Sequence, residues 1–279
     1  MKRTLAYVAL AAGLMSAPAA EAHRGWLLPS AVQVEGNSPW VTVDAAMSET
    51  LFLFDSFPLR FDTATVTGPD GKVTPVDKPN VGHLRTTFEI QLAQPGTYRI
   101  TAASAAVMGS YTLNGETKRF RGSEADIPAG AGDVKLTRMS SRFDTFVTAG
   151  KGNDTALQPT GKGLEMVPVT HPSDLVADTP ARFRFLLDGK PLSGLKVAVV
   201  PGGARYRNAL KDVAATTDVN GLITVQWPMA GPYLIVASYP PRAEGGEGAE
   251  GKMSSDKPGA GDPPARRESY SATVDVLPN

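Results

Sequence analysis

The sequence predicts an all-β protein made of two antiparallel β-sandwich domains behind an export signal. Short segments of alternating apolar and polar residues recur along the chain, separated by turn residues such as Gly, Pro, Asn and Asp. The chain has 28 glycines, 23 prolines and no cysteine, so the domains must be held by packing without disulfides. Removing 22 residues from 279 leaves 257, enough for one large all-β unit or for two domains of about 100 to 130 residues each.

The N-terminal segment has the order of a secretory signal peptide. Lys2 and Arg3 precede a mostly apolar run over residues 5–15, and small residues ending in Ala-Glu-Ala follow it. The apolar run is shorter than the roughly 20 residues that span a bilayer, so it predicts a cleaved signal at residues 1–22. We expect a soluble, exported protein of the bacterial periplasm.

Paired strand signals fill residues 23–148 and predict the first sandwich. A Pro-Asp-Gly turn at residues 69–71 lies between two β-prone runs, and Asn-Gly at residues 114–115 is a strong hairpin signal. A Pro-Gly turn at residues 95–96 is followed by Tyr98, an arrangement familiar in immunoglobulin-like sandwiches. We therefore expect an immunoglobulin-like or prealbumin-like domain here.

The second half repeats this pattern after a break. Residues 133–141 fit either a short helix or an edge strand, and periodicity is then lost over residues 149–162, which we interpret as a linker. Strand and turn signals return over residues 163–279 and predict a second sandwich, closed by a strand at its end. Residues 241–264 contain almost nothing to bury, which predicts a disordered loop.

Composition excludes several classes of function. The chain has 28 basic and 28 acidic residues, and loss of Lys2, Arg3 and Glu21 with the signal leaves 26 basic and 27 acidic. This balance gives no electrostatic reason to bind nucleic acid or an anionic membrane. Without cysteine there is neither a thiolate metal site nor a cysteine nucleophile.

The sequence does not predict an enzyme. It has no nucleophile-elbow pattern, no phosphate-binding glycine motif, and no H-E-x-x-H pair of a zinc protease. Copper-dependent polysaccharide monooxygenases do begin with a metal-bound terminal histidine. The flat aromatic substrate surface usual in those proteins has no counterpart in this sequence.

Cleavage after residue 22 would make His23 the first residue of the mature chain. Its free α-amine and its imidazole could then close a chelate ring on Cu(II) or Ni(II), which prefer nitrogen donors. His83 could supply a third nitrogen, or it could be a surface histidine at the start of a strand. The alternative for His23 itself is that a histidine follows the cut by chance.

Other residues are open to both structural and ligand roles. His171, before a proline, fits a role in a turn or between the domains. Trp26 could lie beneath a terminal metal site or belong to the core. The side chains that could add a carboxylate, or a thioether that would favour Cu(I), also fit turns and surfaces: Asp44, Glu49, Asp55 and Met47.

Several short phrases of the sequence point together to a known family. They are the His and Trp soon after the signal, Asp44-Ala45-Ala46, Pro69-Asp70-Gly71, Gly163-Leu164-Glu165-Met166-Val167-Pro168, Asp188-Gly189-Lys190-Pro191-Leu192-Ser193-Gly194 and Thr217-Asp218-Val219-Asn220-Gly221. With these phrases the chain resembles the DUF4198 family. The resemblance implies a periplasmic protein, often labelled as associated with nickel or cobalt uptake.

These observations predict an accessory protein that binds nickel, cobalt or copper for uptake or homeostasis. His23 and His83 are the predicted metal ligands, and the predicted partners are a membrane permease or an outer-membrane receptor. The alternative is a metal-free β-sandwich adaptor that binds a cell-envelope or transporter protein. The sequence gives no indication of the oligomeric state.

Overall fold

The computed structural model describes residues 23–206, 212–241 and 265–279. These residues form strands, short 3-10 turns and loops, with no α-helix among them, which confirms the all-β prediction. Within these ranges we find no helix with the length and hydropathy needed to cross a bilayer. The predicted signal peptide and nearly all of the predicted disordered loop lie outside the described residues.

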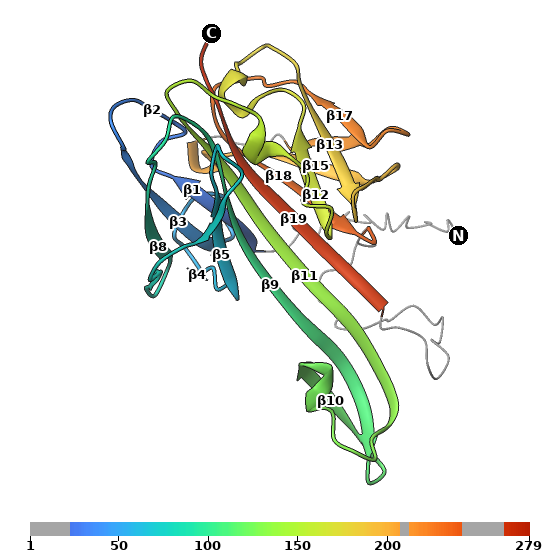
Figure 1. Ribbon diagram of the computed structural model, residues 1–279. Helices are drawn as coiled ribbons and strands as arrows, with labels where there is room; N and C mark the ends of the chain where they lie inside the picture. The colour runs from blue at the N-terminus through green and yellow to red at the C-terminus, as the bar shows by residue number, and fades with distance from the viewer. Residues whose placement is uncertain (1–22, 207–211, 242–264) are drawn as a thin grey trace, which may run out of the picture.

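The first half is a sandwich of two sheets (Figure 1). One sheet has the order β1-β3-β8-β7, with β4 pairing β3, and the other contributes the order β6-β5-β9-β11. Their bounds are β1 (Arg24–Pro29), β3 (Trp40–Ser48), β4 (Phe57–Pro58), β5 (Thr63–Thr67), β6 (Val73–Pro75), β7 (Asn80–Val81), β8 (Thr86–Gln91), β9 (Gly96–Leu113) and β11 (Gly132–Ala149), with β2 (Gln33–Val34) beside β11. Alternate residues of both sheets fill the core between them, as in β3, where Val41, Val43 and Ala45 are buried.

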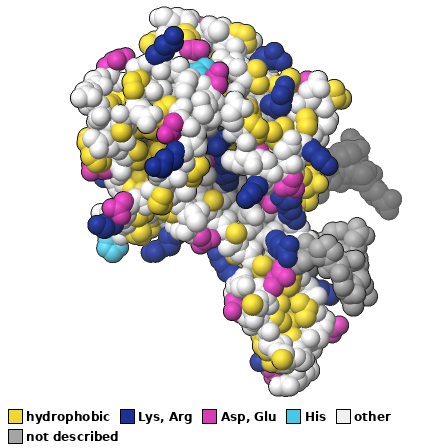
Figure 2. All heavy atoms as spheres, viewed as in Figure 1, with side chains coloured by type: hydrophobic (Ala, Val, Ile, Leu, Met, Phe, Trp, Pro, Cys, Tyr) yellow, Lys and Arg dark blue, Asp and Glu magenta, His cyan; other side chains and the backbone are white. Residues whose placement is uncertain are grey.

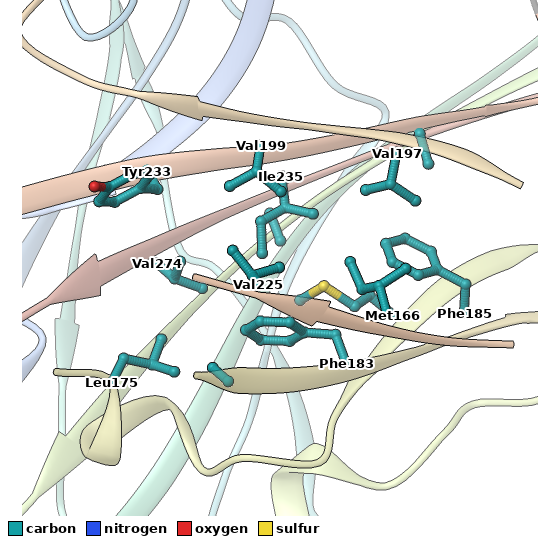
Figure 3. Close-up of a cluster of buried hydrophobic side chains, with 14 of the residues drawn as sticks. Met166, Leu175, Phe183, Phe185, Val197, Val199, Val225, Tyr233, Ile235 and Val274 are labelled. Carbon is teal, nitrogen blue, oxygen red and sulfur yellow. The ribbon is translucent and has the colours of Figure 1, made fainter. Parts of the chain in front are cut away.

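The second half repeats the same strand order. A sheet in which β12, β14 and β17 all pair with β13 faces strands in the order β16-β15-β18-β19. The bounds are β12 (Leu164–Pro168), β13 (Ala181–Leu187), β14 (Lys190–Pro191), β15 (Lys196–Pro201), β16 (Val213–Thr216), β17 (Leu222–Val225), β18 (Gly231–Tyr239) and β19 (Ala265–Val276). Figure 3 shows the core between the two sheets, where Phe183 and Phe185 lie opposite Val197 and Ile235.

A tyrosine marks the same turn in each half. The Tyr98 hydroxyl donates to the Gln94 carbonyl at 2.8 Å, and the Tyr233 hydroxyl donates to the Met229 carbonyl at 2.9 Å. Each tyrosine follows a glycine with positive φ by two residues. This is the tyrosine corner of immunoglobulin-like sandwiches, so the prediction made from the turn before Tyr98 is confirmed.

The two halves share a sheet, which the sequence prediction of two separate antiparallel sandwiches did not include. β11 pairs with β19 in parallel, from Thr137↔Ala265 to Thr145↔Thr273, and joins both sheets into one. Phe143 of β11 belongs to the first core, whereas Phe146 belongs to the second. Because neighbouring strand residues alternate in direction, the two covering sheets lie on opposite faces of the shared sheet.

Polar side chains are buried at the seam, the line along which β11 pairs with β19. The Asp144 carboxylate accepts hydrogen bonds from the Tyr270 hydroxyl at 2.8 Å and the Thr101 hydroxyl at 2.7 Å, and it pairs with Arg142 at 3.1 Å. Arg142 also reaches Glu165 at 3.4 Å. Every charge in this group therefore has a partner, as burial requires.

A third cluster lies between the halves. Trp26 of β1 is fully buried and packs with Leu51 against Val200 and Leu234 of the second half. Its indole N–H donates to the Ser48 hydroxyl at 2.8 Å. Of the two roles considered for Trp26, the structure shows the core role.

The stretch predicted to be a linker is packed against the body. η2 (Thr155–Leu157) buries Ala156 and Leu157, and the Arg99 guanidinium donates to the Gln158 carbonyl at 3.0 Å. η3 (Pro172–Asp174) follows β12, and η4 (Ala204–Tyr206) follows β15.

An arm projects from the body (Figure 1). β9 and β11 are each 18 residues long, and beyond the sandwich they continue as a ribbon with β10 (Glu116–Gly122) on the other side of β9. Residues 133–141 are therefore strand, which decides between the two predicted alternatives. No residue from 103 to 142 is buried. The Asn-Gly hairpin at 114–115 forms as predicted and joins β9 to β10.

Candidate metal centre at the first strand

His23 lies immediately before β1, at one end of the first sandwich. Arg24 is opposite Ser48 in the register of β1 and β3, so His23 comes opposite Glu49. The His23 Nε2 atom is 3.8 Å from the Glu49 Oε1 atom. The imidazole also lies against the Phe57 ring, with 5.1 Å between the ring centroids.

The turn that carries Glu49 is held by Asp55. The Asp55 carboxylate accepts hydrogen bonds from the backbone N–H groups of Glu49 at 3.1 Å and Thr50 at 2.9 Å, and from the Ser56 hydroxyl at 2.9 Å. Burial alone would raise the pKa of Asp55, but these hydrogen bonds outweigh it and lower the pKa. Asp55 therefore positions Glu49, and its oxygens are already occupied.

A hollow of about 430 Å³ opens beside Phe57. Its lining comes from the end of one sheet and from the base of the arm: Met47, Phe57, Pro58, Leu59, Arg60, Ser104, Ser141 and Phe143. A Cβ atom on Gly25 would lie 2.8 Å from the Met47 sulfur and 2.4 Å from the Phe143 ring. Because Gly25 and His23 point the same way along the strand, the thioether and the imidazole are on the same face.

His83 is at the tip of the β7–β8 hairpin and is exposed. The Gly82 N–H donates to the Arg85 carbonyl at 2.9 Å and closes the turn. β8 pairs with β3 as far as Ala45. The next two residues of β3, Ala46 and Met47, pair with β4 in place of a longer β8. Within the described ranges, no hydrogen bond, ion pair or ring contact joins His83 to His23.

The remaining candidates lie elsewhere. His171 accepts a hydrogen bond from the Ser173 N–H on Nδ1 at 3.2 Å, and its Nε2 is 2.9 Å from the Thr97 hydroxyl. Ser104 lines the hollow at the His23 end of the sandwich. Thr97 precedes Ser104 by seven residues on β9, which corresponds to about 23 Å at 3.3 Å per residue. His171 therefore connects the two halves far from His23. Asp44 pairs with Arg85 at 3.3 Å.

Side chains alone do not complete a metal site in the part of the chain that the structure describes. No group of three His, Cys, Asp or Glu side chains there is placed to hold an ion. His23 and Glu49 give two donors, and an α-amine at His23 would be a third. The sequence suggested both residues separately, but only the pairing of β1 with β3 brings them together. Phe57 and the hollow were not predicted, because their residues come from strands distant in sequence.

The sequence matches the model of a family described as a domain of unknown function, DUF4198, over residues 20–240. No curated protein matches it. Among solved structures, the D0-D1 domain of intimin is similar at 12% identity, covering 90% of this chain and 97% of that one, with a TM-score of 0.23.

Two further structures are similar at the same level. A DUF4785 family protein from Legionella pneumophila has 8% identity and a TM-score of 0.24, with 76% of this chain and 52% of that one covered. Elastase-activated alpha-2-macroglobulin from Escherichia coli has 13% identity and a TM-score of 0.23, with coverages of 92% and 20%. This chain thus spans about half of the DUF4785 family protein and about a fifth of the macroglobulin. Similarity at this level does not assign a function.

Proposed function

The chain belongs to the DUF4198 family, and we propose that it is an exported protein that binds a divalent transition metal at a mature N-terminal His23. The metal would be copper, nickel or cobalt, held for uptake or homeostasis and exchanged with an envelope protein such as a permease or receptor. The proposal requires cleavage after residue 22, because only cleavage frees the α-amine.

The approach of Glu49 to His23 is the observation that carries the proposal. Nitrogen donors from the amine and imidazole suit Cu(II) and Ni(II), and a carboxylate 3.8 Å from the imidazole adds an oxygen donor and a negative charge. The Glu49 side chain is 64% exposed, so it can move the short distance that joint ligation requires. Met47 supplies a thioether on the same face, a donor that suits Cu(I).

Metal titration of correctly processed protein tests the proposal. Isothermal titration with Cu(II), Ni(II) and Co(II) at neutral pH should show one site per chain. Affinity should fall as the pH is lowered, because protons compete with the metal for the amine and imidazole nitrogens. A protein with one extra residue before His23 should lose most of the affinity, because the amine becomes an amide.

Two side-chain variants locate the donors. Glu49→Gln should weaken binding about tenfold, within the range expected when one supporting ligand is lost. The matched control, Glu89→Gln, changes an exposed carboxylate on β8 and should have no effect. His83→Ala tests the predicted second histidine ligand directly. If the processed wild-type protein binds none of the three metals, the metal proposal fails and the adaptor alternative gains.

A further inference from the structure

The arm has one face that continues the interior of the first sandwich. Ser104 and Ser141 are opposite each other and line the hollow, and every second residue of β9 beyond Ser104 points the same way. The cross-strand registers extend this face over β10, β11 and the start of β19. We call it the inner face of the arm, and its members are Ala106, Met108, Ser110, Thr112, Thr117, Arg119, Arg121, Lys135, Thr137, Met139, Ala265 and Arg267.

Basic and hydroxyl side chains dominate this inner face. Arg119, Arg121, Lys135 and Arg267 are all exposed, and Arg119 and Lys135 are on either side of Ser110. Asp133 lies in the β-bulge between Gly132 and Lys135, and its carboxylate accepts a hydrogen bond from the Thr112 hydroxyl at 3.5 Å. Among the described residues of the inner face, basic side chains therefore outnumber acidic ones, although the chain as a whole is neutral.

The opposite face of the arm has a cover of its own. It carries Val107, Tyr111, Phe120 and Leu136, each partly buried. The connection from β10 to β11, which contains η1 (Glu124–Asp126), ties to this side through the Arg138–Glu124 ion pair at 2.8 Å. Figure 2 shows the arm with hydrophobic and charged side chains mixed on its surface.

The arm and the end of the first sandwich form a corner, and the shape of this corner favours one kind of partner. The sheet of β1, β3 and β4 stands over the same face and ends at Phe57, so the inner face begins beneath a step. Packed sheets are about 10 Å apart, which makes the step too high for a flat bilayer to lie along the arm and touch its base. A protein segment can enter the corner and reach both the arm and the hollow.

We propose that the inner face of the arm is a docking surface for an acidic segment of a partner protein. The positive charges attract and orient the partner, and the exposed Met108 and the hydroxyl groups supply close contacts. The inference goes beyond the proposed function, because it requires no metal. If both hold, the docked segment lies beside His23, across the hollow.

Fluorescence anisotropy with a labelled decaglutamate peptide, in the presence of a chelator, tests the docking surface. Binding should be measurable at about 20 mM salt and weaken strongly at about 200 mM, as screening of exposed charges requires. The variant R119E/R121E/K135E should bind at least about tenfold more weakly. The control K162E/R182E/R184E makes the same change in net charge at exposed positions of the second half and should retain binding within about threefold.

Hydrogen exchange on the peptide complex gives a second readout. Protection should appear over residues 105–112 and 132–138, while the second half stays unchanged. Equal weakening in both triple variants, or no binding at low salt, would overturn the proposal. So would vesicles of phosphatidylcholine and phosphatidylglycerol that bind through the arm where the peptide does not, since that result identifies a membrane surface.

Discussion

The two halves of the molecule share one strand order but differ in how far their last two strands extend. In the second half, β18 and β19 have 9 and 12 residues and end near the sandwich. In the first half, the equivalent β9 and β11 have 18 residues each and continue as the arm. The same strand order thus forms a sandwich without an arm in the second half and a sandwich with a projecting arm in the first half. The difference is made by strand length, while the tyrosine corner and the alternating core are kept.

The two cores also differ in size, and the core of the first half is the smaller. Among the described residues, the cluster of the second half contains 22 buried side chains and that of the first half 15. Buried apolar surface is the main source of folding free energy, so the first half should be the less stable of the two. The candidate metal centre, the hollow and the arm all belong to this first half.

The largest expected effect comes from Trp26→Ala, which removes the centre of the cluster between the halves. Loss of a buried tryptophan should lower the free energy of unfolding by about 3 to 5 kcal/mol. Because the first half has the smaller core, calorimetry should show its transition separate from and below that of the second half. One unshifted transition would contradict the comparison of the two cores.

Tyr270→Phe tests the seam, with an expected loss of about 1.5 to 3 kcal/mol for a hydrogen bond to a buried charge. Burial, and after it the Asp144 charge, raise the pKa of Tyr270 well above its ordinary value. The folded state therefore holds this proton more tightly than the unfolded state does. The resulting stability is complete below about pH 10 and is lost as the pH rises further. Denaturant unfolding between about pH 9 and 11 should show a steeper decline for the wild-type protein than for Tyr270→Phe.

The two tyrosine corners allow a matched test of the halves. Tyr98→Phe and Tyr233→Phe each remove a hydroxyl that bonds to a backbone carbonyl four residues earlier, at a cost of about 0.5 to 1.5 kcal/mol. The same loss should lower the melting temperature of the first-half transition with Tyr98→Phe and of the second-half transition with Tyr233→Phe. If both variants shift a single transition equally, the halves unfold as one unit.

The smallest global effect is expected from Gly109→Ala in the arm. A Cβ atom there would lie 1.9 Å from the Lys135 carbonyl oxygen, so β9 and β11 must separate locally. Gly132→Ala is the control, since a Cβ at that position meets nothing within 4 Å. Global stability should change by less than about 0.5 kcal/mol in both, because the arm buries no side chain. Amide exchange in the arm should accelerate only in Gly109→Ala.

Local turn chemistry accounts for what the sequence predicted well. The Pro-Asp-Gly turn joins β5 to β6 and the Asn-Gly turn joins β9 to β10, since each depends on four or five neighbouring residues. The pairing of β11 with β19 depends on residues about 128 positions apart, which no local pattern records. For the same reason Glu49 could be named as a candidate but not placed beside His23.

The parallel pairing of β11 with β19 also constrains the order of folding. During synthesis, strands from the first half are complete long before β19 exists, yet β19 is the strand that pairs with the edge of β11 from Thr137 to Thr145. Contacts of such long sequence separation form slowly. A nascent chain would therefore carry an unsatisfied strand edge until β19 has been synthesised, and a chaperone that shields that edge would have a defined target.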